Sequence, residues 1–125
     1  MIKGIGTDIL QIERAAAALS RTPGLAQRVL TPQELTGYQS ASDAVRFFAK
    51  RFAAKEAIVK AIGSGIGRGV SWQHIQINKD SFGKPLVELS GGGYNYASQQ
   101  NIAVVHLSYT DERDYVVAFA IAESS

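Results

Sequence analysis

The run RFAAKEAIVKAIGSGIGRG, residues 51–69, places charged side chains among small apolar residues and then becomes rich in glycine. On a helical wheel at about 100° per residue, Lys55 falls within the apolar stripe, Glu56 lies at its edge, and Lys60 follows one turn later. In an ordinary surface helix, Glu56 and Lys60 would form a weak exposed pair and Lys55 would extend its ammonium group to water. The residues beside Glu56 are small, so we expect something to approach this helix closely: they are Ala49, Ala53 and Ala57.

The glycine-rich segment GSGIGRG follows this helix directly. Glycines let a backbone come close to a ligand, and their free amides can cradle phosphate oxygens. The segment matches neither the dinucleotide fingerprint nor the P-loop, and a simple helix stop would also explain it. Combined with Arg51 and the lysines on the preceding turns, it favours a phosphate site.

Asp8 supplies a second acid in GIGTDI, where Gly4 and Gly6 interrupt an otherwise apolar β pattern. An aspartate at the end of a strand can simply cap the next helix. Together with Glu56, however, it would form a hard oxygen site with open positions, which suits Mg²⁺ bound through two carboxylates and substrate phosphates.

The whole chain limits the alternatives. Its 125 residues suit one domain, residues 1–125, and the absence of cysteine excludes thiolate metal sites, so a metal would be held largely by oxygen. We find no apolar run of membrane-spanning length and no signal-peptide pattern after Met1, which predicts a cytoplasmic protein without membrane contact. Residues 1–69 carry ten Lys or Arg against five Asp or Glu (+5), and residues 70–125 carry three against six (−3). The basic half is therefore the candidate for meeting an anion.

The elements that must position these residues are predicted from periodicity and capping signals. Their order, strand, helices and then a mostly antiparallel run of strands, indicates an α+β fold with the sheet packed against one long helix and several short helices. The expected elements are a strand ending near Asp8, a helix over 10–21, a short helix opened by Thr22 and Pro23, a third helix capped by Thr31 and Glu34, a long helix from Ser42 or Asp43 to Ile62, two strands around a turn at Lys79 to Pro85, a short helix in GGGYNYASQQN, and two strands around TDERD.

The pair GIGTDI and RFAAKEAIVKAIGSGIG, about forty residues apart, resembles the signature of the 4′-phosphopantetheinyl transferases. Chain length, the GKP turn at Gly83 to Pro85 and the closing strands resemble the short, single-domain, holo-acyl-carrier-protein synthase type of this family. The resemblance implies transfer of 4′-phosphopantetheine from coenzyme A to a serine of apo acyl carrier protein, with release of adenosine 3′,5′-bisphosphate, in fatty acid biosynthesis. It also implies homotrimers with active sites at the subunit interfaces.

The resemblance further implies Mg²⁺ on Asp8 and Glu56, with Lys60 at the pyrophosphate or assisting proton transfer. The residues that it places along coenzyme A are Arg51, Lys60, Gly63, Ser64, Gly65, Lys84 and Pro85. It places the first helical region against the acidic carrier protein, where Arg14, Arg21 and Arg28 recur every seven residues, although Pro23 and Gly24 interrupt a single helix.

Two positions depart from or fall outside this pattern. Relatives often have His where this chain has Asp111, which questions a nucleotide contact there. His106 lies in an apolar strand, is expected to be a core histidine, and is assigned no role.

The identity of the general base stays open: Glu56 directly or through water, a metal-bound water, or Glu34 can accept the serine proton, and we favour Glu56. Other reaction classes are also compatible with the residues. A Mg²⁺-dependent nucleotide phosphohydrolase would use the same acids on water, and a non-catalytic basic module would bind RNA or an acidic protein without them. The aromatic residues are not interleaved with basic ones as an RNA-stacking surface prefers, so we predict no nucleic-acid partner.

Overall fold

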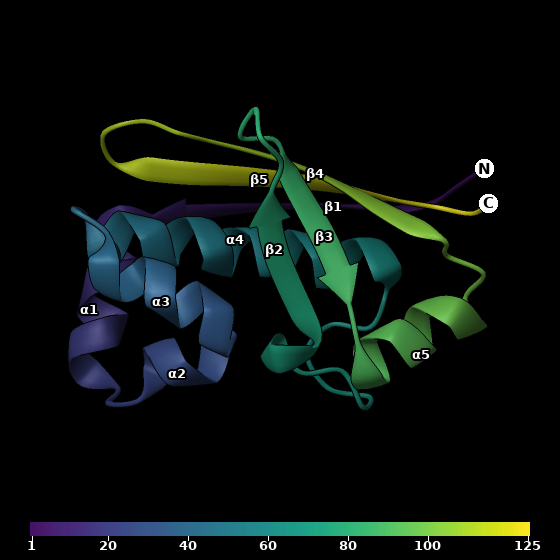
Figure 1. Cartoon of the computed structure of the whole chain (residues 1–125), viewed down its shortest axis with the longest axis horizontal. Helices are drawn as coiled ribbons and strands as arrows, with labels where there is room; N and C mark the ends of the chain where they lie inside the picture. The colour runs from purple at the N-terminus through teal and green to yellow at the C-terminus, as the bar shows by residue number, and fades with distance from the viewer.

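The computed structural model describes residues 1–125. A three-stranded antiparallel sheet has the order β1-β5-β4, and the long helix α4 (Ala44–Ile62) crosses one of its faces (Figure 1). Its strands are β1 (Ile2–Gln11), β4 (Val104–Asp111) and β5 (Tyr115–Glu123). A separate hairpin pairs β2 (Ile75–Lys79) with β3 (Pro85–Leu89). The predicted α+β class, with an antiparallel sheet on one long helix, is confirmed.

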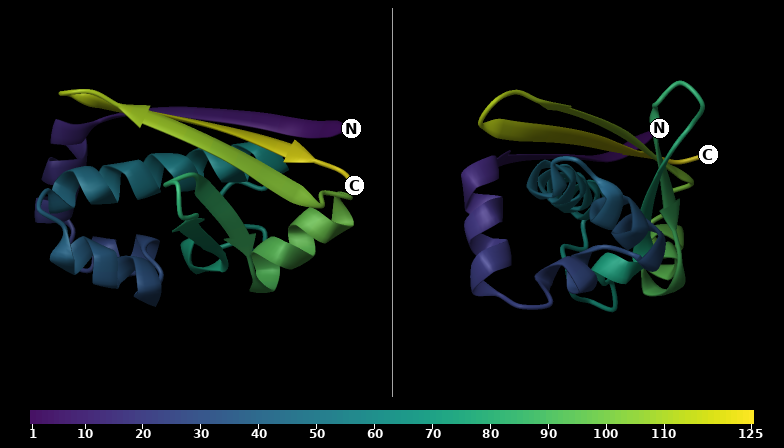
Figure 2. Two further views of the ribbon diagram at one scale, coloured as in Figure 1. Left: turned by 45° about the horizontal axis from the view of Figure 1, so that its top comes forward. Right: turned by 60° about the vertical axis from the view of Figure 1, so that its left-hand side comes forward.

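The short helices lie on the side of α4 away from the sheet (Figure 2). They are α1 (Ile12–Arg21), α2 (Leu25–Val29), α3 (Pro32–Ser40), η1 (Trp72–His74) and α5 (Gly91–Gln99). None of the helices contains an apolar stretch of membrane-spanning length.

Helix α4 begins and ends where its sequence predicts. The Asp43 side chain accepts a hydrogen bond from the Arg46 amide at 3.1 Å, and Gly63 adopts a left-handed conformation at φ 88°. Between them, Phe48, Val59 and Ile62 are buried in the core, as the apolar stripe requires.

The capping box that opens α3 is also confirmed, since Thr31 and Glu34 satisfy each other's backbone amides. The prediction that Thr22 opens the second helix is wrong. Thr22 instead ends α1, donating its amide to Ala18, and α2 starts after Gly24, whose φ of 82° only glycine adopts readily. A tight reversal replaces the expected cap.

Helix α4 lies very close to β1 because the facing residues have almost no side chain. A Cβ added to Gly4 would lie 2.1 Å from the Ala61 carbonyl oxygen, and one added to Gly6 would lie 2.0 Å from the Ala57 carbonyl oxygen. The alanine side of α4 is therefore filled by the protein's own sheet. Our expectation that something approaches this helix closely is confirmed: the approaching element is β1, and Ala49, Ala53 and Ala57 are all completely buried.

Lys55 does not extend to water as the amphipathic pattern suggests. Its side chain is 0% exposed, and Nζ lies 2.7 Å from Glu34 Oε1 while donating to the carbonyls of Val29 and Trp72 at 2.7 and 3.1 Å. The second Glu34 oxygen accepts the Ile77 amide at 2.9 Å. This buried ion pair joins α3, α4 and β2.

The outer face of the sheet is apolar and exposed. Ile5 and Ile9 are 62% and 65% exposed, and Phe119 is 42% exposed. His106 lies on this same face, with Nε2 2.8 Å from Glu123 Oε1, so our expectation of a core histidine is wrong. The reason is the two-residue alternation of β4, which buries Val105 and Leu107 and turns His106 outward.

Candidate active site

Asp8, Glu56 and Lys60 form a cluster where β1 crosses α4. Because side chains alternate along a strand, Asp8 falls on the same face as Gly4 and Gly6, which is the face toward α4. Lys60 Nζ donates to the Thr7 carbonyl at 2.9 Å and lies 3.4 Å from Asp8 Oδ1. The glycines that looked out of place in a strand therefore allow an acid on β1 to reach a lysine on the helix.

The two carboxylates of the cluster hold protons more tightly than free ones. Burial raises the pKa of Asp8, although the hydrogen bond and the charge of Lys60 oppose the shift. Burial, followed by the negative charge of Asp8, raises the pKa of Glu56, again against Lys60. Glu56 has no hydrogen-bond partner within the protein, so its carboxylate is available to a metal, water or substrate.

The donor set fits Mg²⁺ in chemical terms. The negative charge of Asp8 raises the pKa of Glu56, and a divalent cation would offset the repulsion between the two carboxylates. Both carboxylates also offer hard oxygen ligands. The structure holds no group of three acids or histidines, so the protein alone would not complete a coordination shell. That matches an ion that takes its remaining ligands from water and substrate phosphates.

The glycine-rich segment caps α4 rather than presenting free amides. The amides of Gly63, Ser64 and Gly65 all donate to the Val59 carbonyl, at 3.1, 3.1 and 3.2 Å. A phosphate cradle in the glycine-rich segment therefore could not use these three amides. The placement of Gly63, Ser64 and Gly65 along coenzyme A stays a prediction, and it would rest on close approach to the loop.

Arg51 lies far from this cluster within one chain. At about 1.5 Å and 100° per residue, the nine-residue offset from Lys60 puts the two roughly 14 Å apart along α4 and on opposite faces. Arg51 Nη1 donates to the Tyr109 hydroxyl on β4 at 3.3 Å, and its guanidinium lies 4.7 Å from the centre of the Phe47 ring. A single chain does not bring all the predicted coenzyme contacts together.

The remaining predicted residues lie on exposed turns and helices. Lys84 precedes β3 at the tip of the hairpin, where the Asp80 side chain accepts the Phe82 and Lys84 amides at 2.8 and 2.9 Å. Pro85 begins β3. The carrier-binding candidates Arg14, Arg21 and Arg28 are exposed and make no ion pair, but the reversal at 22–24 prevents them from sharing one helical face.

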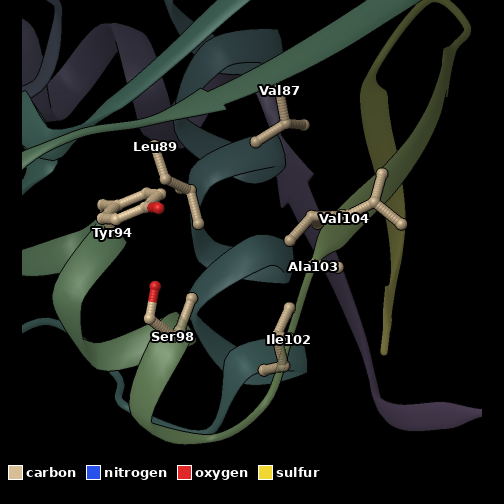
Figure 3. Close-up of a pocket in the computed structure, with 9 residues that line it drawn as sticks. Val87, Leu89, Tyr94, Ser98, Ile102, Ala103 and Val104 are labelled. Carbon is tan, nitrogen blue, oxygen red and sulfur yellow. The ribbon is translucent and has the colours of Figure 1, made fainter. Parts of the chain in front are cut away.

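Glu34 is not available as a general base. It is 3% exposed, and both oxygens are held by backbone amides and Lys55. The structure also contains an apolar cavity of about 200 Å³ between β3, α5 and β4 (Figure 3). No acid, lysine or arginine lines it, so it offers no chemistry for a phosphate.

Sequence reasoning missed the role of Arg46 and Lys50. Arg46 Nη1 lies 2.8 Å from Asp111 Oδ2, and Lys50 Nζ lies 3.3 Å from Asp111 Oδ1. Partial burial would raise the pKa of Asp111, but the hydrogen bonds from Arg46 and Lys50 outweigh it and lower that pKa. The only available signal was that the first two turns of the long helix carry basic residues, which does not reveal an acid 65 positions away.

Residues 4–120 match the model of the 4′-phosphopantetheinyl transferase superfamily. The chain belongs to this superfamily. A relative described as holo-[acyl-carrier-protein] synthase, from Vibrio cholerae, is 48% identical over 124 residues, covering 98% of each chain. The family predicted from the two motifs is confirmed.

Solved structures agree at the level of the fold. The holo-[acyl-carrier-protein] synthase of Neisseria meningitidis superposes with a TM-score of 0.93 at 42% identity, covering 99% of this chain and 100% of the other. The Bacillus anthracis holo-(acyl-carrier-protein) synthase, solved in complex with CoA (3′,5′-ADP), gives a TM-score of 0.84 at 35% identity, covering 100% and 99%.

Proposed function

We propose that this protein transfers 4′-phosphopantetheine from coenzyme A to a serine of an apo acyl carrier protein. The superfamily match and the relatives described as holo-[acyl-carrier-protein] synthases support this enzyme class. The observation that carries the proposal is the meeting of Asp8, Glu56 and Lys60 where β1 crosses α4. Two carboxylates that can bind a metal ion and a lysine that can donate to phosphate oxygens suit the binding of a diphosphate.

Each residue of the cluster has a role in this reaction. Asp8 and Glu56 would hold Mg²⁺, which when bound neutralises charge on phosphate oxygens. The Lys60 side chain is half exposed, and its Nζ would donate to the diphosphate, stabilising charge that develops during transfer. We assign Glu56 as the general base, acting directly or through one water, because it is unpaired and its pKa is raised.

The transfer moves one proton, forms one phosphorus–oxygen bond and breaks another. The serine hydroxyl proton moves to the Glu56 carboxylate or to a water that it orients. The serine oxygen bonds to the phosphorus that carries the pantetheine arm, and the bond from that phosphorus to the bridging oxygen breaks. Adenosine 3′,5′-bisphosphate leaves with that oxygen, and Lys60 offsets its added charge.

The experiment that tests this reaction is intact-protein mass spectrometry of an apo acyl carrier protein incubated with the enzyme, Mg²⁺ and coenzyme A. We expect a mass gain of one phosphopantetheine, and none with the Glu56→Gln variant. No gain on a competent carrier would refute the transferase. Consumption of coenzyme A without carrier modification would instead support the phosphohydrolase.

We further propose that the active protein is a homotrimer in which neighbouring copies share each site. Two observations support sharing: Arg51 and Lys60 lie on opposite faces of one α4, and the exposed outer face of the sheet needs covering. On this arrangement, Arg51, Lys84 and Pro85 of one copy bind coenzyme A whose diphosphate lies at Asp8, Glu56, Lys60 and the Gly63–Gly65 loop of the next.

Mixing of inactive variants tests the sharing. Arg51→Gln and Glu56→Gln chains, each inactive alone, should recover about a quarter of wild-type activity when co-refolded at equal amounts, because one interface in four joins two intact halves. No recovery, with mixed oligomers shown by mass spectrometry, would mean that each chain builds its own site.

Carrier recognition belongs to the same proposal. The exposed, unpaired Arg14, Arg21 and Arg28 would meet an acidic carrier surface from α1 and α2. We expect charge reversal at these positions to raise the KM for the carrier while leaving the KM for coenzyme A unchanged. The cytoplasmic location predicted from the sequence remains a prediction.

A further inference from the structure

A polar groove runs between α3, the first half of α4 and β2. It consists of two adjoining hollows of about 480 and 280 Å³ that share Phe47, Arg51 and Lys79 as lining residues. Arg46 and Lys50 line the smaller hollow. Four cations therefore border the groove, which makes it attractive to an anion.

Arg51 has a hydrogen-bond donor that no other group in the protein uses. Its side chain is only 9% exposed, and its buried Nε has no hydrogen-bond partner. The nearest acid, Glu34, has an oxygen 3.7 Å from that Nε, but Glu34 is already paired with Lys55. A buried guanidinium with an unused donor favours a ligand that brings an acceptor.

Asp111, at the end of β4, does not line the groove itself but contacts two of the cations that border it. It contacts both Arg46 and Lys50, and the two contacts differ in importance. Arg46 also pairs with Asp43 and donates to the carbonyls of Glu112 and Arg113 at 2.6 and 3.1 Å, so it keeps partners without Asp111. Lys50 has no other ion pair, so Asp111 is its only counter-charge.

We propose that Asp111 sets the affinity of this groove for phosphate esters by occupying Lys50, a cation that the ligand would otherwise bind. The inference rests on the proposed function, because it takes the ligand to be the nucleotide end of coenzyme A. The carboxylate acts as an internal competitor: Asp43 and Asp111 balance two of the four cations, leaving Arg51 and Lys79 for the ligand. Asp111 thereby weakens retention of the released bisphosphate.

Calorimetric titration with adenosine 3′,5′-bisphosphate tests this role. We expect the Asp111→Asn variant to bind about five- to tenfold more tightly than the wild type, with a steeper loss of affinity as salt rises. The gain should disappear in the Asp111→Asn/Lys50→Met double variant, since Lys50 is the cation released. Asp114→Asn is the matched control, because it removes an exposed acid of the same turn that makes no ion pair.

The inference would be overturned by unchanged or weaker binding by Asp111→Asn, or by a gain that survives in the double variant. A gain of equal size in Asp114→Asn would also overturn it, since it would show an effect of net charge alone. Inorganic phosphate serves as a second titrant and should show the same order of variants. The mass-spectrometric transfer assay on the wild type is independent, so a failed transfer there would identify failure of the proposed function instead.

Discussion

At the scale of single residues, the candidate site brings two mutually repelling carboxylates close to each other. Asp8 and Glu56 are partly buried near each other, and both have a raised pKa, with Lys60 as the only cation opposing the shift. Apart from the charge of Lys60, Glu56 has no stabilising contact, since it forms no hydrogen bond or ion pair within the protein. A partly buried carboxylate without such a contact lowers stability, which is the loss expected of a residue that we propose to act in catalysis.

The variant Glu56→Gln should therefore be inactive and yet more stable without metal. We expect transfer activity to fall at least about 100-fold, because the proposed base and a proposed metal ligand are lost. Thermal unfolding without divalent ions should show a higher Tm than the wild type. Added Mg²⁺ should raise the Tm of the wild type and not that of the variant; an equal rise in both would contradict a metal site at Glu56.

The lowered pKa of Asp111 predicts that the stability of the protein depends on pH. Its pKa is lowered in the folded state, so its ion pairs stabilise the protein above the unfolded pKa of about 4 and are lost as the pH falls through the lowered value. Between about pH 6 and pH 3, the free energy of unfolding should fall less for Asp111→Asn than for the wild type. Urea titrations at several pH values measure this, and an equal fall in both proteins would contradict stabilising ion pairs at Asp111.

At the scale of elements, the contact between β1 and α4 determines whether a site exists. Glycine on the strand and alanine on the helix remove the side chains between them, so the two backbones touch. The ion pair of Lys55 with Glu34 holds the opposite side of α4 against α3 and β2. Helix α4 is therefore fixed on both sides, with Glu56 beside Asp8.

The variant Gly6→Ala should separate these two elements. Its Cβ would lie 2.0 Å from the Ala57 carbonyl oxygen and 2.7 Å from the Ala61 amide nitrogen, and neither backbone atom can move without shifting α4. We expect a loss of about 3 kcal/mol in the free energy of unfolding, together with lower transfer activity. Thr7→Ala, at the adjacent exposed position, is the control and should cost less than about 1 kcal/mol by urea denaturation.

Replacement of one partner of the buried pair should be more harmful than replacement of both. Lys55→Met leaves Glu34 buried without its main counter-charge, which should lower the free energy of unfolding by about 3–5 kcal/mol. The Glu34→Gln/Lys55→Met double variant should recover part of this loss. If the double variant is less stable than Lys55→Met alone, the pair is not the source of the effect.

At the scale of the whole molecule, the two faces of the sheet have different proposed roles. Its inner face positions Asp8 against α4, and its outer face exposes Ile5, Ile9 and Phe119. An exposed apolar face of this kind is unusual for a monomer, so we place the proposed contact between copies on the outer face. That contact lies on the opposite side of the sheet from the proposed metal site.

A charge on the outer face should therefore block assembly and leave the fold intact. Phe119 is 42% exposed in one chain, so Phe119→Glu is tolerated there but would bury a charge between copies. We expect monomers by size exclusion with light scattering, an unchanged circular dichroism spectrum and loss of transfer activity. Gln99→Glu, an exposed change on α5, is the control. A fully active monomer would contradict a site shared between copies.

Local signals in the sequence predicted most of the elements of this protein and suggested the chemistry of its candidate site. Caps at Asp43 and Thr31, the stop at Gly63 and the alternation of the strands are local signals, and they fixed α4, α3 and the sheet. The motifs around Glu56 and Asp8 predicted the superfamily, which the comparison confirms, while the roles of the two acids stay a proposal.

Tertiary structure alone decided which residues meet. Whether the alanines of α4 face a ligand or β1, whether Lys55 is exposed or paired, and whether Asp111 reaches Lys50 all depend on contacts between segments far apart in the chain. The separation of Arg51 from Lys60 follows from helical geometry, but only the fold shows that Arg51 reaches β4 and Lys60 reaches β1, which are the opposite edges of the sheet. Local periodicity fixes the face on which a side chain lies, and packing fixes what that face meets.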